Sequence, residues 1–154
     1  MGHSSKSNKL RIDIADEQDA HQVNYDRLIA AVRLIFADAG YSQGEVSIAI
    51  VTDEAMHELN RQYLQHDYPT DVLSFVLEED EGRLDGQLIV SADYASREAV
   101  TFGWTTDDEL LLYTIHGTLH LVGYDDLEPD LKAEMREQEK LYLAKFGLTP
   151  NYSE

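Results

Sequence analysis

The chain has 154 residues and contains no cysteine. This absence excludes a disulfide-stabilised scaffold and also excludes zinc or iron–sulfur sites built from thiolates, so any metal site must use histidine, aspartate or glutamate. Long apolar runs are absent as well, because the longest one, residues 110–115, is far too short to cross a bilayer. The first eight residues lack the apolar segment of a secretion signal. We therefore expect a cytoplasmic protein that makes no contact with a membrane.

Basic residues are scarce. Only 12 Lys and Arg stand against 30 Asp and Glu, which gives a formal net charge of −18. A protein that binds nucleic acid mainly by neutralising phosphates needs clustered Lys and Arg, and this sequence has no basic run. Binding to RNA would therefore have to depend on a local pocket, a metal ion or a partner.

The pattern of apolar residues predicts alternating strands and helices. Strands are expected near residues 9–15, 46–51, 72–76 and 87–90, with an acidic turn region at 78–83. Helices are expected to begin at Asn24, Thr52, Ser91, Thr105 or Thr106, and Pro129. The sequence predicts an α+β fold: a single compact domain over residues 9–148, with a four-stranded mixed sheet, about five helices, and tails at 1–8 and 149–154.

Two of the expected helices have distinctive apolar patterns. The helix over residues 105–122 is apolar nearly all round, so we expect it to be central and covered on several sides. The last helix should bury a stripe that consists of Leu131, Met135, Gln138, Tyr142 and Phe146.

Two histidines lie four residues apart in the central helix. The i, i+4 spacing of His116 and His120 places both imidazoles on one helical face, where they can bind the same metal ion. Gly123 ends the helix, and Asp126 can then supply a third ligand at a cleft beside the helix end. Two imidazoles and a carboxylate can bind zinc, iron(II) or other ions, and we expect one divalent ion, with Zn²⁺ as the first candidate.

Structural alternatives remain open for each of these residues. The two histidines could be core residues bonded to backbone carbonyls. Asp126 could instead cap the following helix, and Asp125 could take its place as ligand.

Gly117 follows the first histidine. In the His-Glu-x-x-His metallopeptidases that position holds the general base, which glycine cannot provide, so peptide hydrolysis by that mechanism is disfavoured. We also expect the small residue to leave room for an approach to the ion.

Three blocks of the sequence resemble one known family. Residues 116–125, which read His-Gly-Thr-Leu-His-Leu-Val-Gly-Tyr-Asp, are similar to the signature of the YbeY family of metal-dependent endoribonucleases. Residues 59–75 and 86–91 resemble two further blocks of that family in the same order. The resemblance implies a single-strand-specific endoribonuclease that acts in ribosomal RNA maturation and ribosome assembly. It also implies ribosomal RNA and the small ribosomal subunit as partners, with a protein partner as a further candidate.

The sequence departs from this family at three positions. Asp126 stands where the family usually has a third histidine ligand, Leu64 where it has an arginine, and Gln87 where it often has an acid. An anionic ligand lowers the charge of a metal centre by one unit, so the ion should polarise water less and hydrolysis at neutral pH should be slower. These departures leave two alternatives: a non-catalytic ribosome-assembly factor, or a hydrolase of another ester or amide.

Four other residues are candidates for roles in the reaction. His66 could act as a catalytic donor or acid where the family arginine is missing, or it could be an exposed loop histidine. Thr70 and Asp71 could line the cleft and bind substrate, although Asp71 could instead bond backbone amides. Arg61 could bind substrate or pair with a surface acid.

Overall fold

The computed structural model describes residues 9–64 and 72–150, apart from the side chains of Tyr63, Leu64 and Phe102. The predicted tails fall largely outside this part of the chain and stay predictions. The described strands form one four-stranded sheet in the order β1-β2-β4-β3. They are β1 (Leu10–Asp16), β2 (Gly44–Val51), β3 (Val72–Asp80) and β4 (Arg83–Ser91). β2 pairs in parallel with both β1 and β4, whereas β3 is antiparallel to β4, so the predicted mixed sheet is confirmed.

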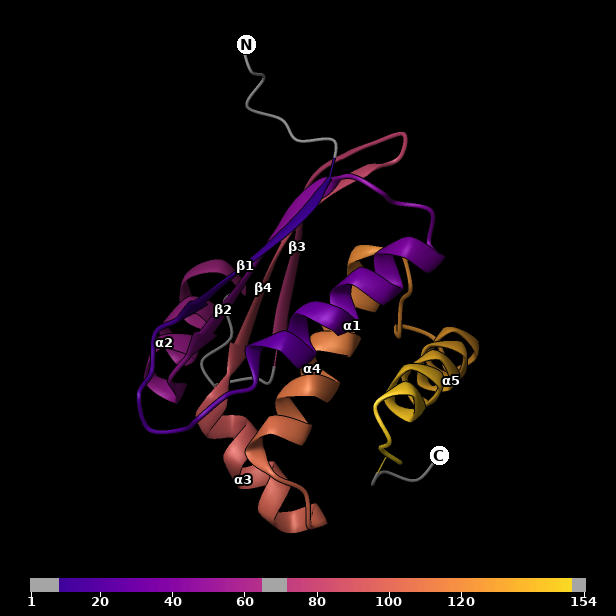
Figure 1. Ribbon diagram of the computed structural model, residues 1–154. Helices are drawn as coiled ribbons and strands as arrows, with labels where there is room; N and C mark the ends of the chain where they lie inside the picture. The colour runs from indigo at the N-terminus through magenta and orange to yellow at the C-terminus, as the bar shows by residue number, and fades with distance from the viewer. Residues whose placement is uncertain (1–8, 65–71, 151–154) are drawn as a thin grey trace.

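The helices cover the two faces of the sheet unequally. They are α1 (Tyr25–Asp38), α2 (Asp53–Leu59), α3 (Ala92–Phe102), α4 (Thr106–Leu121) and α5 (Pro129–Lys145). In Figure 1, α1 and α4 lie together on one side of the sheet, α2 lies on the other side, and α5 packs outside α4. Within the part of the chain that the structure describes, no helix has the length and apolar character to cross a membrane.

Four helices begin at the predicted caps. The side chains of Asn24, Thr52, Ser91 and Thr105 each accept a hydrogen bond from the backbone N–H three residues later. Thr105 forms a full capping box with Asp108, which satisfies two backbone donors at the start of α4. The helix that carries the two histidines is therefore fixed locally at its first turn.

α4 is the central helix of the fold, as predicted. It is buried nearly all round, and it packs against α1, α3, α5 and the sheet. A Cβ atom at Gly117 would lie 2.9 Å from Cδ2 of Leu88 and 3.0 Å from Cγ2 of Val72. The glycine therefore lets α4 approach β3 and β4 closely. The expectation that Gly117 leaves room beside the ion is wrong, because this position faces the sheet.

The predicted turn region at residues 78–83 is much shorter in the structure. β3 runs to Asp80 and β4 begins at Arg83, so only two residues form the turn. The acidic end of β3 pairs with β4, and one of its carboxylates has a hydrogen-bond partner, because Tyr41 donates its hydroxyl to Glu79. Arg83 also forms an ion pair with Asp85 at 3.1 Å.

Two helical predictions also need correction. The helix that begins at Asp53 changes to a π-helical turn, η1 (Asn60–Leu64). The buried Asn60 donates its side-chain amide to the Met56 carbonyl at 3.2 Å, and such a bond competes with the regular helical ladder. In α5 the buried residues are Met135, Glu139, Tyr142 and Leu143, so the predicted apolar stripe is rotated and Leu131 is exposed.

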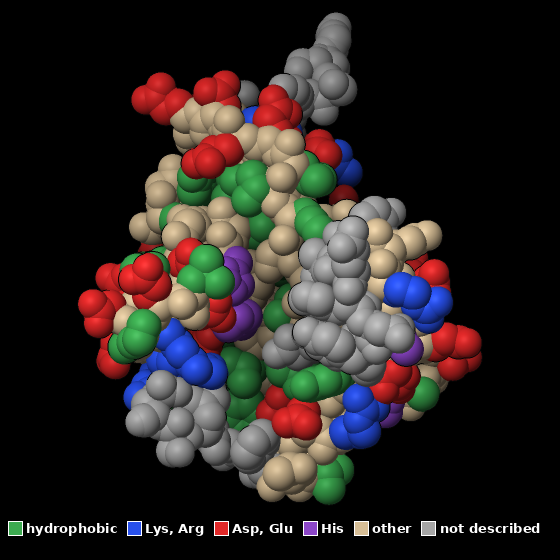
Figure 2. Space-filling model, turned by 180° about the vertical axis from the view of Figure 1, so that it is seen from behind, with side chains coloured by type: hydrophobic (Ala, Val, Ile, Leu, Met, Phe, Trp, Pro, Cys, Tyr) green, Lys and Arg blue, Asp and Glu red, His purple; other side chains and the backbone are tan. Residues whose placement is uncertain are grey.

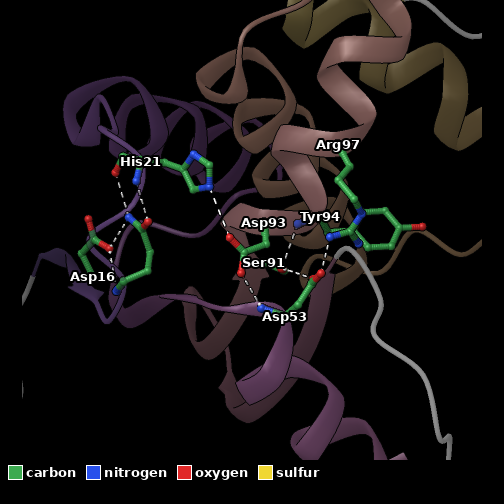
Figure 3. A network of polar contacts seen from close by, with 8 residues as sticks. Asp16, His21, Asp53, Ser91, Asp93, Tyr94 and Arg97 are labelled. Carbon is green, nitrogen blue, oxygen red and sulfur yellow. Dashed lines mark hydrogen bonds and ion pairs between the residues drawn. The ribbon is translucent and has the colours of Figure 1, made fainter.

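A polar network joins the carboxyl ends of the parallel strands (Figure 3). Asp93 accepts a hydrogen bond from the backbone N–H of Asp53 at 2.9 Å and contacts Nε2 of His21 at 3.2 Å. Ser91 donates to Asp53 at 3.0 Å, and Arg97 forms an ion pair with the same carboxylate. The network fixes the starts of α2 and α3 relative to the loop after β1.

The packing of α5 on α1 predicts a measurable loss of stability at alkaline pH. Tyr142 donates its hydroxyl to Asp38 at 2.6 Å, and burial, followed by this bond, raises the pKa of Tyr142 above its usual value. Since the folded-state pKa lies above the unfolded one, this stability is complete below about pH 10 and falls as the pH rises towards the folded-state pKa. Urea unfolding of Tyr142→Phe should therefore show a weaker decline above about pH 10 than the original chain.

The variant Asp38→Asn provides the matched comparison. It removes the carboxylate but keeps Tyr142 buried, and burial is the larger cause of the shift, so most of the alkaline decline should remain. A parallel decline in the original chain and in Tyr142→Phe would contradict the assignment.

Candidate metal centre

The two histidines lie in the last two turns of α4, the most buried helix. Their ring centroids are 4.8 Å apart, and the side chains of His116 and His120 are 22% and 29% exposed. The rings are therefore close to each other and still open to solvent. Figure 2 shows histidine side chains at the border of a hollow in this face of the molecule.

Each imidazole is oriented through its Nδ1 atom. Nδ1 of His116 lies 2.5 Å from Oε2 of Glu139, which is fully buried on α5. Nδ1 of His120 lies 3.1 Å from the backbone carbonyl oxygen of Tyr124. A carbonyl only accepts, so Nδ1 of His120 is the donor, and a neutral ring then carries its lone pair on Nε2. The same assignment follows for His116 beside a carboxylate.

A turn after α4 brings an acid to these two nitrogens. Gly123 adopts a φ of 112°, which favours glycine and reverses the chain direction. Asp125 accepts hydrogen bonds from the backbone N–H groups of Asp126 and Leu127 at 2.6 and 3.1 Å. Asp125 is therefore occupied by the turn, whereas Asp126 faces the histidines.

The three ligand atoms converge. Oδ2 of Asp126 lies 3.7 Å from Nε2 of His116 and 3.7 Å from Nε2 of His120, and all three atoms lie within 4.8 Å of one another. In a tetrahedral zinc site two such ligands are about 3.3 Å apart. The two 3.7 Å separations exceed this value by a few tenths of an ångström and the remaining one by at most about 1.5 Å, so modest movements of the three side chains would close the set around a divalent cation.

The electrostatic surroundings also favour a cation. Three lone pairs that face one another repel unless a positive charge lies between them. The site is at the carboxyl end of α4, where the helix dipole is negative. Arg136 donates to Oε1 of Glu139 at 3.0 Å, so the buried carboxylate has a partner at each oxygen and can remain ionised.

The other candidate residues are not brought into this group by the described structure. His66, Thr70 and Asp71 lie outside the described residues, so their roles stay predictions. Arg61 lies in η1 and forms an ion pair with Glu58 at 3.5 Å, which was the alternative to substrate binding. Leu64 is the last residue of η1.

Sequence reasoning missed three groups at this site. They are the Glu139 carboxylate, the Arg136 guanidinium and the Tyr124 carbonyl. Only the spacing of Arg136 and Glu139, three residues apart on a helix directly after the motif, could have drawn attention to them.

Known proteins are similar to this chain in sequence and in fold. The family model described as Endoribonuclease YbeY matches residues 10–147. Endoribonuclease YbeY of Bacillus licheniformis is 38% identical, with 91% of this chain and 97% of that protein covered, and the Desulfitobacterium hafniense protein of the same name is 39% identical, with 75% and 80% covered. The solution structure of TM1509 from Thermotoga maritima has a TM-score of 0.61 and 30% identity, and the match covers 88% of this chain and 87% of that one. The chain therefore belongs to the endoribonuclease YbeY family, as its three sequence blocks predicted.

Proposed function

We propose that the protein is a metal-dependent endoribonuclease that acts on single-stranded ribosomal RNA during ribosome assembly. The observation that carries the proposal is the convergence of Nε2 of His116, Nε2 of His120 and Oδ2 of Asp126. The curated relatives are named endoribonucleases, which favours a catalytic role over the non-catalytic alternative. One divalent ion, with zinc as the first candidate, suits two imidazoles and one carboxylate.

The chain's own residues would hold and orient the reacting groups. Glu139 and the Tyr124 carbonyl keep Nε2 of both histidines directed to one point. A divalent ion bound there would supply Lewis acidity to a phosphoryl oxygen and to water. The ligand side chains are partly exposed, so a phosphodiester can approach from the solvent side. Because the proposed substrate is ribosomal RNA, we infer that the protein acts in the cytoplasm near the small ribosomal subunit.

Removal of one imidazole tests the metal centre directly. His120→Ala leaves two ligands, so the purified variant should lose its stoichiometric metal in elemental analysis and its cleavage of single-stranded RNA. His57→Ala is the matched control because His57 lies on α2, across the sheet, and this variant should keep both properties. Cleavage that persists in metal-free His120→Ala would exclude the proposed mechanism.

The identity of the third ligand should set the rate. Asp126→His replaces an anionic ligand by a neutral one and raises the charge of the centre by one unit, so RNA cleavage at neutral pH should become faster at equal metal occupancy. Asp126→Asn keeps the side-chain size without the charge and should bind metal more weakly than the original chain. Equal metal binding and equal rates in all three proteins would show that Asp126 is not a ligand.

Glu139 should affect the centre through His116. In Glu139→Gln the side chain keeps its size but loses its charge, and the preference for a proton on Nδ1 of His116 weakens. Loss of such an orienting partner typically lowers metal affinity or activity by about 10–100-fold. Titration of the apoprotein with zinc against a chromophoric chelator measures the change. Glu137→Gln, an equal charge change at an exposed position of the same helix, should have no effect on zinc affinity.

A further inference from the structure

Most arginines of this acidic protein are already used in internal ion pairs. The chain has 12 basic residues in total. Five guanidinium groups outside α5 pair with carboxylates: Arg11 with Asp13, Arg27 with Asp108, Arg61 with Glu58, Arg83 with Asp85, and Arg97 with Asp53. RNA binding requires cations that can exchange their counterions for phosphates. An RNA-binding surface would therefore have to use the other basic residues.

Three basic residues form a line along α5. Lys132, Arg136 and Lys140 are spaced by four residues, so they lie on one side of the helix over about 12 Å. We call this group the α5 basic stripe. Lys132 and Lys140 are exposed, and among residues 9–64 and 72–150 neither ammonium group makes an ion pair. Like charges at this spacing repel and destabilise a helix slightly, which an anion bound along the stripe would reverse.

The stripe begins at the candidate metal centre. Lys132 and Arg136 line one small pocket together with two of the proposed ligands, His116 and Asp126. The side chain of Arg136 is 26% exposed although its guanidinium group donates to Glu139. A phosphodiester at the metal centre would therefore have a cation of α5 beside it, and the following phosphates would meet the rest of the helix.

We propose that the α5 basic stripe binds the phosphates of a single RNA strand that leaves the metal centre along this helix. The inference rests on the proposed function, since it takes RNA as the substrate of the centre. Lys132 and Lys140 neutralise phosphates, and Arg136, which stays bonded to Glu139, adds positive charge between them. The stripe supplies the local positive potential that the net charge of the chain does not.

The salt dependence of RNA binding tests the stripe. The probe is a fluorescent, unstructured RNA oligonucleotide with 2′-O-methyl groups, and its dissociation constant for the metal-loaded protein is measured by anisotropy at several salt concentrations. The logarithm of the association constant falls linearly with the logarithm of the salt concentration. Each lost phosphate contact on a single strand makes this slope less negative by about 0.7. Lys132→Gln and Lys140→Gln should each show this change in slope together with weaker binding. In the double variant the slope should change by about 1.4. Metal content should stay unchanged, since neither lysine is a proposed ligand.

Lys145→Gln is the matched control. Lys145 is also exposed on α5, but it lies on a different side of the helix, and its substitution changes the net charge equally. Its salt slope should equal that of the original chain.

In cleavage assays with unmodified RNA, Lys132→Gln should raise KM more than it lowers kcat.

The outcomes separate the stripe from the proposed function. Equal slopes for Lys132→Gln, Lys140→Gln and Lys145→Gln, with RNA still bound and cleaved, would overturn the stripe and leave the endoribonuclease intact. Binding that depends on the two stripe lysines without any cleavage of RNA would support the stripe and overturn the function. A metal-loaded protein that does not bind the oligonucleotide would overturn the stripe.

Discussion

The hydrogen bonds at Nδ1 of His116 and His120 determine the direction in which both rings face. An imidazole that is free to rotate can present either nitrogen to a metal ion. Two such rings on adjacent turns would not direct their lone pairs to the same point. Here a carboxylate from α5 and a carbonyl from the turn after α4 each take one Nδ1, which leaves both Nε2 atoms directed towards Asp126. The site therefore depends on the docking of α5 and on the turn at Gly123 as much as on its ligands.

The docking of α5 in turn depends on a buried charge. A fully buried carboxylate such as Glu139 is costly unless it is paired and hydrogen-bonded, and here one oxygen contacts His116 and the other accepts from Arg136. About one turn further along α5, Tyr142 donates its hydroxyl to Asp38 of α1. A loss of packing at α5 would therefore disorient His116 before it removed any ligand, so the stability of this helix and the geometry of the centre are coupled.

Local patterns were sufficient to predict most of the fold and part of the site. The caps of α1, α2, α3 and α4 involve residues three apart, and the histidine pair involves one helical turn, so both are visible in the sequence. Asp125 and Asp126 could not be separated until the turn geometry showed which one bonds the backbone. Glu139 was missed because its partner lies 23 residues away and a glutamate in a charged helix is expected to be exposed. Gly117 was misjudged for a similar reason, since the sheet that it contacts is distant in sequence.

A net charge of −18 should repel the phosphates of RNA, but salt screens each charge so that it acts only over a limited distance. At physiological ionic strength the screening length is about 8 Å, so an exposed acid on the far side of the molecule contributes little at the metal centre. Lys132 and Arg136, by contrast, border the same pocket as His116 and Asp126. The helical spacing of α5 distributes its cations so that no basic run appears in the sequence. The local field at the cleft, which follows from the fold, therefore decides whether a phosphate can approach.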